Sequence, residues 1–285
     1  MSYCVLTAVE RCRWLLVVAA AAALSSGMLR ADVVITRLSN QGVIISDGLE
    51  TQIMIDGLVV EPYSIYGGLP EGLHEQFSQA AGPFAGIDLA LVTHQHHEHN
   101  QPAYACTFMQ KSTTTLLVTS SQVVDLMREK CRQFITASPR VKIISPRYDA
   151  PEVIHAGAAT VTVFPLSHGV FKYAALENFG HLVEIGGMRV LHLGDASMDA
   201  ADFERAGVAQ MKADIVLIPF LYFSPAPGVS FIDRFLDAPH KIAVHIPPDE
   251  MEEVKAWLST QFPGVLVMDS ALDQIVFSLS ESPSP

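Results

Sequence analysis

The sequence predicts an α/β protein in which helices cover β-sheets. Short β-rich runs dominate the first part of the chain, and strands alternate with helices further along. Several apolar runs are continuous, such as Leu89–Val92 and Ile215–Pro219, instead of alternating with polar residues. Strands of that kind are buried on both faces, which requires helices against the sheets. The hydrophobic content of 49% also excludes a disordered chain.

The first predicted strands are short and closely spaced. Their ranges are Val33–Thr36, Gly42–Ile45 and Gln52–Ile55. The dipeptide Asp47-Gly48 is typical of a hairpin turn between the second and the third of them. A loop rich in glycine, proline and tyrosine is expected at Glu61–Gly72. Its part Tyr63–Gly72 could shape a pocket, with Tyr66-Gly67-Gly68 as a flexible flap. The buried strand Leu89–Val92 then runs into a histidine cluster.

Helices and strands alternate in the rest of the chain. Ser120 and Ser121 can cap a helix whose apolar residues recur at helical spacing from Val123 to Phe134. Further strands are predicted at Val141–Ser145, Thr160–Phe164, His181–Ile185, Arg189–Leu193, Ile215–Pro219, Lys241–His245 and Gln274–Leu279. Further helices are predicted at Ala200–Arg205, Ile232–Asp237 and Asp249–Gln261.

Residues 1–31 have the pattern of a secretory signal peptide. The charged residues Glu10, Arg11 and Arg13 precede an apolar run of 11 residues, Trp14–Leu24. A transmembrane helix needs about 20 apolar residues, so this run is short for a membrane span. We therefore predict a cleaved leader and one domain at residues 32–285, secreted or periplasmic. An uncleaved membrane anchor is the alternative.

Two cysteines remain after removal of the leader, Cys106 and Cys131. An even pair in an oxidising compartment predicts a disulfide between them. The alternative is a pair of buried thiols that pack as small hydrophobic groups.

The charge balance is acidic, with 18 Lys and Arg against 30 Asp and Glu, which gives a net charge of −12. Such a chain repels phosphates unless it carries a local basic patch, so nucleic acid is not expected as a partner. A small-molecule substrate is compatible with this balance.

The segment His94–Asn100 is the most informative part of the sequence. His94, His96, His97, Glu98 and His99 follow a buried strand directly, where α/β sheets place their chemistry. Imidazole and carboxylate ligands suit zinc, and also iron, manganese or nickel. The alternative is a solvated polar loop. Three later residues, His168, Asp195 and His245, also stand at the ends of apolar strands.

These residues resemble the metallo-β-lactamase superfamily in their order. The matching segments are His94-x-His96-x-Glu98-His99, His168, Gly194-Asp195 and His245, with Asn40–Ile45 and Ile53–Gly57 before them. The resemblance covers essentially the whole mature chain. It implies an αββα sandwich, two mixed sheets flanked by helices, with a dinuclear metal site at one edge.

The resemblance also implies which residues would bind the metals. His94, His96 and His168 would hold the first ion; Glu98, His99 and His245 would hold the second; Asp195 would bridge them. The superfamily usually has Asp in place of Glu98, whose extra methylene moves the carboxylate by about 1.5 Å. The second site is therefore expected to be weaker, to select another metal or to be absent. His97 could reach in as a substitute ligand.

The implied activity is hydrolysis of an ester, lactone or amide by a metal-activated water, with Glu98 and Asp195 orienting it and moving its proton. A phosphodiesterase with the same site and a non-catalytic metal-binding protein are the alternatives. Asp56 is expected either to orient a ligand histidine or to form a turn before Gly57. The aromatic segment Phe220–Phe223 could line a pocket or pack in the core, and Lys172 and Tyr173 could contact a substrate anion.

Overall fold

The computed structural model describes residues 32–63, 65–169, 171–224 and 227–278. The predicted leader, residues 1–31, lies outside these ranges and stays a prediction. Within the described ranges, no helix has the length and apolar character needed to cross a lipid bilayer.

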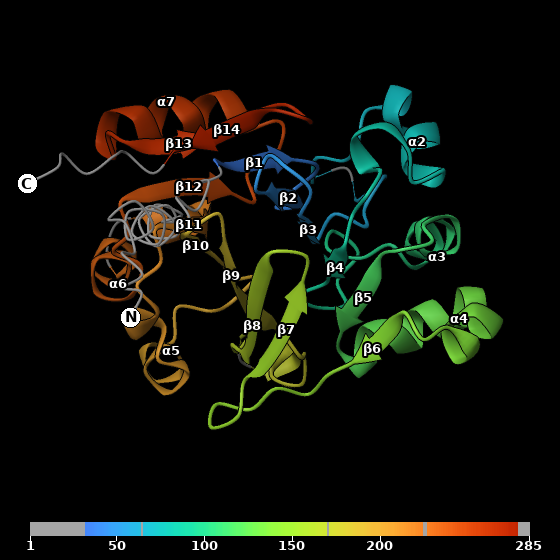
Figure 1. Cartoon of the computed structure of the whole chain (residues 1–285). Coiled ribbons are helices and arrows are strands. Elements are labelled where there is room, and N and C mark those ends of the chain that lie inside the picture. The colour runs from blue at the N-terminus through green and yellow to red at the C-terminus, as the bar shows by residue number, and fades with distance from the viewer. Residues whose placement is uncertain (1–31, 64, 170, 225–226, 279–285) are drawn as a thin grey trace, which may run out of the picture. The chain divides into compact units, whose positions relative to one another are not determined.

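Two seven-stranded sheets form the centre of the domain (Figure 1). The strands of the first sheet, in spatial order, are β14 (Gln274–Phe277), β1 (Val33–Arg37), β2 (Val43–Ser46), β3 (Gln52–Ile55), β4 (Leu89–Leu91), β5 (Leu116–Thr119) and β6 (Val141–Ile143). Those of the second are β13 (Val265–Val267), β12 (His240–Val244), β11 (Ile215–Pro219), β10 (Met188–His192), β9 (Phe179–Ile185), β8 (Ala159–Pro165) and β7 (Glu152–Ala156).

Helices cover the outer face of each sheet. Against the first sheet pack α2 (Glu71–Ser78), α3 (Pro102–Lys111) and α4 (Ser121–Ala137). Against the second pack α5 (Ala200–Ala206), α6 (Gly228–Phe235) and α7 (Met251–Gln261). The layers are therefore helix, sheet, sheet and helix, which confirms the predicted αββα sandwich.

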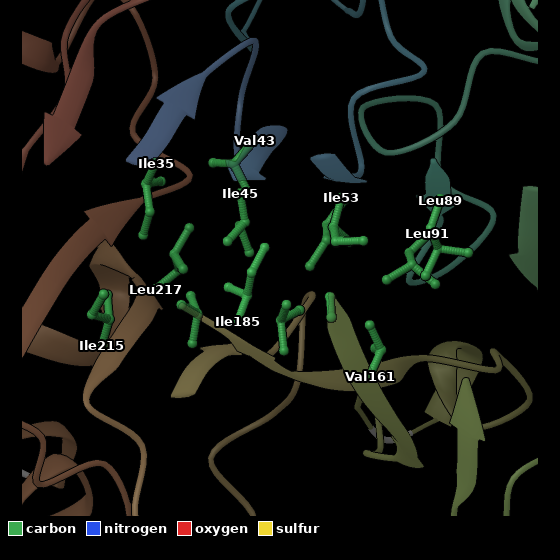
Figure 2. Close-up of a cluster of buried hydrophobic side chains, with 14 of the residues drawn as sticks. Ile35, Val43, Ile45, Ile53, Leu89, Leu91, Val161, Ile185, Ile215 and Leu217 are labelled. Atoms are coloured by element: carbon green, nitrogen blue, oxygen red, sulfur yellow. The ribbon is translucent and has the colours of Figure 1, made fainter. Parts of the chain in front are cut away.

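The largest apolar cluster lies between the two sheets. Figure 2 shows Ile35, Ile45 and Ile53 of the first sheet facing Ile185 and Leu217 of the second. Each of these side chains is nearly inaccessible to water, and such burial contributes roughly 1.5–3 kcal/mol per side chain. Neighbouring residues of the same strands face the helices instead, so the continuous apolar runs do mark strands buried on both sides.

Strand direction decides where the chain can place a site. In the first sheet β1 and β3 are both antiparallel to β2, and β3 is parallel to β4. In the second sheet β8 and β10 are both antiparallel to β9, and β10 to β12 are parallel. Consequently the carboxyl ends of β1, β3 and β4 share one edge, and those of β8, β10 and β12 share the corresponding edge of the other sheet.

Among the strands and α-helices of the described residues, five were not predicted from the sequence: β5, β7, β13, α2 and α3. The strand β7 is an edge strand in which Val153 is 51% exposed, so its apolar residues do not form a clear run. Helix α2 buries a single residue, Phe77, which leaves little helical periodicity to recognise. The predicted loop Glu61–Gly72 ends earlier than expected, because α2 begins at Glu71.

Cys106 of α3 and Cys131 of α4 form a disulfide with a Cα–Cα distance of 6.0 Å. This confirms the predicted bridge over the alternative of two free thiols. The backbone of α4 departs from helical geometry at Cys131, so the bridge is attached at a kink.

Candidate metal centre

The predicted ligands all stand just after strand ends at the shared edge. His94–Asn100 forms the loop after β4, and His168, Asp195 and His245 follow β8, β10 and β12. The structure gathers them into two groups that share Asp195, and within each group the potential ligand atoms lie within 4.8 Å of one another. These are the two sets of residues that the resemblance implied.

The first group contains His94, His96, His168 and Asp195. His94 Nε2 lies 3.0 Å from His96 Nδ1 and 3.7 Å from Asp195 Oδ2. His168 Nε2 lies 3.6 Å from the same carboxylate oxygen. Several nitrogens thus converge on one side of Asp195.

The second group contains Glu98, His99, Asp195 and His245. His99 Nε2 lies 3.3 Å from Asp195 Oδ2, and His245 Nε2 lies 3.4 Å from Asp195 Oδ1. The longer side chain of Glu98 does not exclude it, because its carboxylate lies within the group. The structure therefore gives no support to the expectation that Glu98 removes the second group. His97 does not join either group; its ring stacks on Tyr63 at 4.6 Å.

The donor atoms fit a divalent metal ion in number, chemistry and spacing. Ligand atoms around a tetrahedral zinc ion with bonds of about 2.0–2.1 Å stand about 3.3–3.4 Å apart, close to the spacings found here. In addition, both ring nitrogens of His168 and Nε2 of His245 are buried without a hydrogen-bond partner in the described part of the chain. Buried polar groups without partners are rare, and bound metal ions would satisfy one ring nitrogen of each of these two histidines.

Asp56 orients two of the histidines from behind. Its Oδ2 accepts hydrogen bonds from His99 Nδ1 at 2.8 Å and from the Thr93 hydroxyl at 2.7 Å, and that hydroxyl lies 2.9 Å from His94 Nδ1. These contacts leave Nε2 of both rings directed at the candidate centre. Burial raises the pKa of Asp56, but His99, His192 and the backbone N–H of Thr93 together lower it overall, so the carboxylate stays charged. The orienting role predicted for Asp56 is thus supported, although its φ of 50° is also that of a turn.

Gly194 and Asn178 place Asp195. Gly194 has a φ of +58°, and a Cβ there would approach Asn178 Oδ1 to 2.4 Å, so a larger residue does not fit. Asn178 Oδ1 accepts from the Asp195 backbone N–H, while its amide donates to the carbonyls of Leu166 and Leu193. One buried side chain therefore joins the loops that carry His168 and Asp195. Sequence reasoning missed Asn178, because a single asparagine before a strand carries no distinctive pattern.

The electrostatics of the centre favour cations. Burial, followed by the neighbouring His99, holds the pKa of His94 well below its usual value, which keeps that ring neutral and able to coordinate. Burial opposes ionisation of Asp195, but His99 and His245 outweigh it and hold the pKa of Asp195 well below its usual value. For His99, Asp195 and Asp56 outweigh burial and raise the pKa to about 10. A metal ion at His99 must therefore displace a proton.

A pocket of about 610 Å³ opens beside the two groups. Its lining residues include Tyr63, Ile65, Tyr66, His96, Glu98, Leu126, Glu129, Lys130 and Tyr173. The Tyr66 ring meets the His245 ring edge-on at 5.0 Å, and burial together with Glu98 and Asp195 raises the pKa of Tyr66 to about 12. The predicted tyrosine loop thus does line the pocket.

Two further sequence expectations have different outcomes. In the segment Phe220–Phe223, Tyr222 and Phe223 are buried in the core of the second sheet, so core packing, not the metal-site pocket, accounts for them. Tyr173 lines the pocket, whereas Lys172 lies over the Tyr173 ring at 4.6 Å and is not among the lining residues.

Known proteins share this fold. A possible metal-dependent hydrolase from Veillonella parvula superposes with a TM-score of 0.58 and 15% identity, over 86% of this chain and 98% of that one. Igni18, a metallo hydrolase from Ignicoccus hospitalis, superposes with a TM-score of 0.56 and 14% identity, over 87% of this chain and 100% of that one. Zinc-bound PqqB from Methylobacterium extorquens superposes with a TM-score of 0.56 and 16% identity, over 82% of this chain and 86% of that one. At such identities the similarity shows the fold alone.

The family of the chain is identified by its sequence. No curated protein matches it. The family model described as the beta-lactamase superfamily domain matches residues 68–262, which is more than half of the chain. That range contains the whole loop His94–Asn100 and also His168, Asp195 and His245. The chain therefore belongs to the beta-lactamase superfamily.

Proposed function

We propose that this protein is a metal-dependent hydrolase that cleaves an ester, lactone or amide bond of a small molecule. The observation that carries the proposal is the pair of ligand groups that share Asp195 beside an open pocket. His94, His96 and His168 would hold one ion with Asp195, and Glu98, His99 and His245 would hold the other. Zinc suits these ligands, and PqqB, which shares the fold, is a zinc-bound protein.

The two carboxylates have different parts in this proposal. A divalent ion of this kind lowers the pKa of a bound water to about 7 and so supplies hydroxide at neutral pH. Both oxygens of Asp195 already face histidines, which suits it to holding the site together. Glu98 also lines the pocket, so its carboxylate is placed to accept a proton from the attacking water and return it to the leaving group.

The pocket lining favours an uncharged substrate with an apolar or aromatic part. Tyr63, Ile65, Tyr66 and Leu126 offer an apolar wall of a size common for small-molecule sites. Lys130 is the only Lys or Arg among the described lining residues, and Glu98 and Glu129 oppose it. These side chains supply little positive charge for a phosphodiester anion, so the preference for a carbonyl substrate rests on the apolar wall.

Metal content and turnover of the purified full-length protein test the proposal. We expect at least about one equivalent of transition metal by mass spectrometry, and hydrolysis of chromogenic esters or lactones faster than that of bis(p-nitrophenyl) phosphate. Protein that binds no metal would contradict the whole proposal. Turnover confined to phosphodiesters would overturn the substrate class only, and bound metal without any turnover would favour a metal-binding role.

Neighbouring histidines provide a matched pair of variants. His96→Ala should lose metal and lower kcat/KM by at least about 100-fold, because its ring belongs to the first group. His97→Ala should retain metal, because His97 packs on Tyr63 outside both groups. Equal metal loss in the two variants would refute the assigned ligands.

We also propose that the protein is exported. The support is the leader-like sequence of residues 1–31 together with the Cys106–Cys131 disulfide, since such bonds persist in oxidising compartments. Fractionation of the producing cells, with N-terminal sequencing of the mature protein, tests this.

A further inference from the structure

The side chain of Gln41 ends inside the second ligand group. It is buried, with 1% of its surface exposed, and its Nε2 donates to Asp195 Oδ1 at 2.5 Å. The same atom lies 3.5 Å from His99 Nε2. His245 Nε2 approaches the same oxygen of Asp195, at 3.4 Å. The end of Gln41 therefore lies among the atoms assigned to one ion.

The turn between β1 and β2 holds Gln41 firmly in this position. Gly42 N donates to Ser39 O at 3.1 Å, and Leu38 N donates to Gly42 O at 2.7 Å. A Cβ at Gly42 would approach Asp56 O to 2.5 Å, so the turn requires glycine to lie this close to the centre. His192 Nε2 lies 3.0 Å from the backbone carbonyl of Gln41 and can donate to it. The side chain is thus presented by a fixed backbone.

A glutamine amide can present either of two groups at the same place. A half-turn about its last bond exchanges the NH2 group with the carbonyl oxygen and leaves the rest of the side chain in position. Toward a bare carboxylate the NH2 group is favoured, because a carboxylate only accepts hydrogen bonds. Toward a cation the carbonyl oxygen is favoured, since it is a neutral oxygen ligand of the kind that divalent metals accept.

We infer that Gln41 is an additional ligand of the second metal ion, through its side-chain carbonyl oxygen. This inference rests on the proposed metal centre. In the protein alone the Gln41 amide holds Asp195, and on metal binding it turns to coordinate. The second ion then has five protein ligands: Glu98, His99, Asp195, His245 and Gln41.

Metal titration of the chelator-treated full-length protein tests the role of Gln41. Zinc binding is followed by calorimetry for the first and second equivalents, and the visible spectrum of the cobalt-substituted protein reports the coordination number. Gln41→Leu removes the oxygen and the nitrogen at the end of the side chain and leaves an apolar group that is one bond shorter. This variant should bind the second equivalent of zinc roughly 10-fold or more weakly than wild type and the first equivalent with unchanged affinity. The visible bands of its cobalt-substituted form should be more intense. Gln41→Glu, which retains an oxygen ligand, should still bind the second equivalent of zinc.

A role for Gln41 as a competitor of the metal predicts the opposite change in zinc affinity. If Gln41 only hydrogen-bonds to Asp195 and competes with the metal, Gln41→Leu should raise the affinity for the second equivalent of zinc. That result would overturn the inference. An unchanged second equivalent would also overturn it. Uptake of a single ion by wild-type protein would overturn the inference about Gln41 but remain compatible with a hydrolase that uses one metal ion. Wild-type protein that takes up none would remove the proposed function together with the inference. Circular dichroism of each variant checks that it is folded.

Discussion

His181 and His192 face each other across β9 and β10, in the interior between the sheets. They pair directly in the strand register, and both are almost completely buried. Neither ring nitrogen of His181 has a hydrogen-bond partner among the described residues. Burial lowers the pKa of His181 to about 3 and also lowers that of His192. Both rings are therefore neutral in the folded protein near neutral pH.

This burial predicts a loss of stability in acid. The unfolded chain protonates His181 near pH 6.5, and the folded chain does so only near pH 3, so the unfolded state binds more protons between these values. Stability should fall by about 1.4 kcal/mol per pH unit from this residue, or about 2 kcal/mol between pH 6.5 and 5. His181→Leu should remove that part of the loss in urea unfolding of metal-depleted protein at pH 8 and pH 5. The exposed His155, replaced by Leu, is the matched control, and equal acid sensitivity of wild type and His181→Leu would count against the account.

Individual site residues were predictable where sequence spacing carried the information. His94, His96, Glu98 and His99 lie in one loop, so the strand before them fixes their common position. Gln41 was not predictable as a site residue, because its contact with Asp195 spans 154 positions and depends on two sheets meeting at one edge. A buried glutamine in a tight turn before an apolar strand is the only sequence feature that could have drawn attention to it.

At the scale of elements, the disulfide joins α3 to α4, and α4 contributes Leu126, Glu129 and Lys130 to the pocket. Ser120 caps the start of α4, as the sequence indicated, because its side chain accepts a hydrogen bond from Val123 N. Strands made of continuous apolar runs were equally predictable. The strands β5 and β13 were not, since short runs of four and three residues match several local structures equally well.

Removal of the disulfide should destabilise the domain markedly. The bridge closes a loop with a sequence separation of 25 residues, which corresponds to about 3–4 kcal/mol of stabilisation through the unfolded state. The double variant Cys106→Ser and Cys131→Ser should lose about that much free energy of unfolding in urea. Reduction should shift wild type to the same midpoint and leave the double variant unchanged. A loss below about 1 kcal/mol would show that α3 and α4 are held by packing alone.

At the scale of the whole molecule, the proposed metals would tie the two sheets together. Their ligands come from the loop after β4 of the first sheet and from the ends of β8, β10 and β12 of the second. The layers and the location of this edge followed from strand alternation and from the family resemblance. Strand order did not, because it depends on long-range pairing.

Metal removal should therefore lower the thermal stability of the domain. At a free zinc concentration of about 100 times Kd, each bound ion adds about 2.7 kcal/mol, which corresponds to a rise in Tm of roughly 5–10 °C per ion for a domain of this size. Calorimetric scans before and after chelation measure it. Asp195→Asn, which weakens both groups at once, should show little change on chelation. A Tm that is independent of zinc in wild type would contradict a bridging centre.

The pairing of β14 with β1 has a consequence for how the chain folds. Val33 pairs with Phe277, so β1 gains this neighbour only after the long stretch of chain between the two strands has been synthesised. Until then one edge of β1 has unpaired backbone groups that can associate with other chains. Contacts of such long sequence separation also slow folding. We therefore expect that the nascent chain depends on being kept unfolded until residues 274–277 have emerged, and that this interval is when the protein is most prone to aggregate.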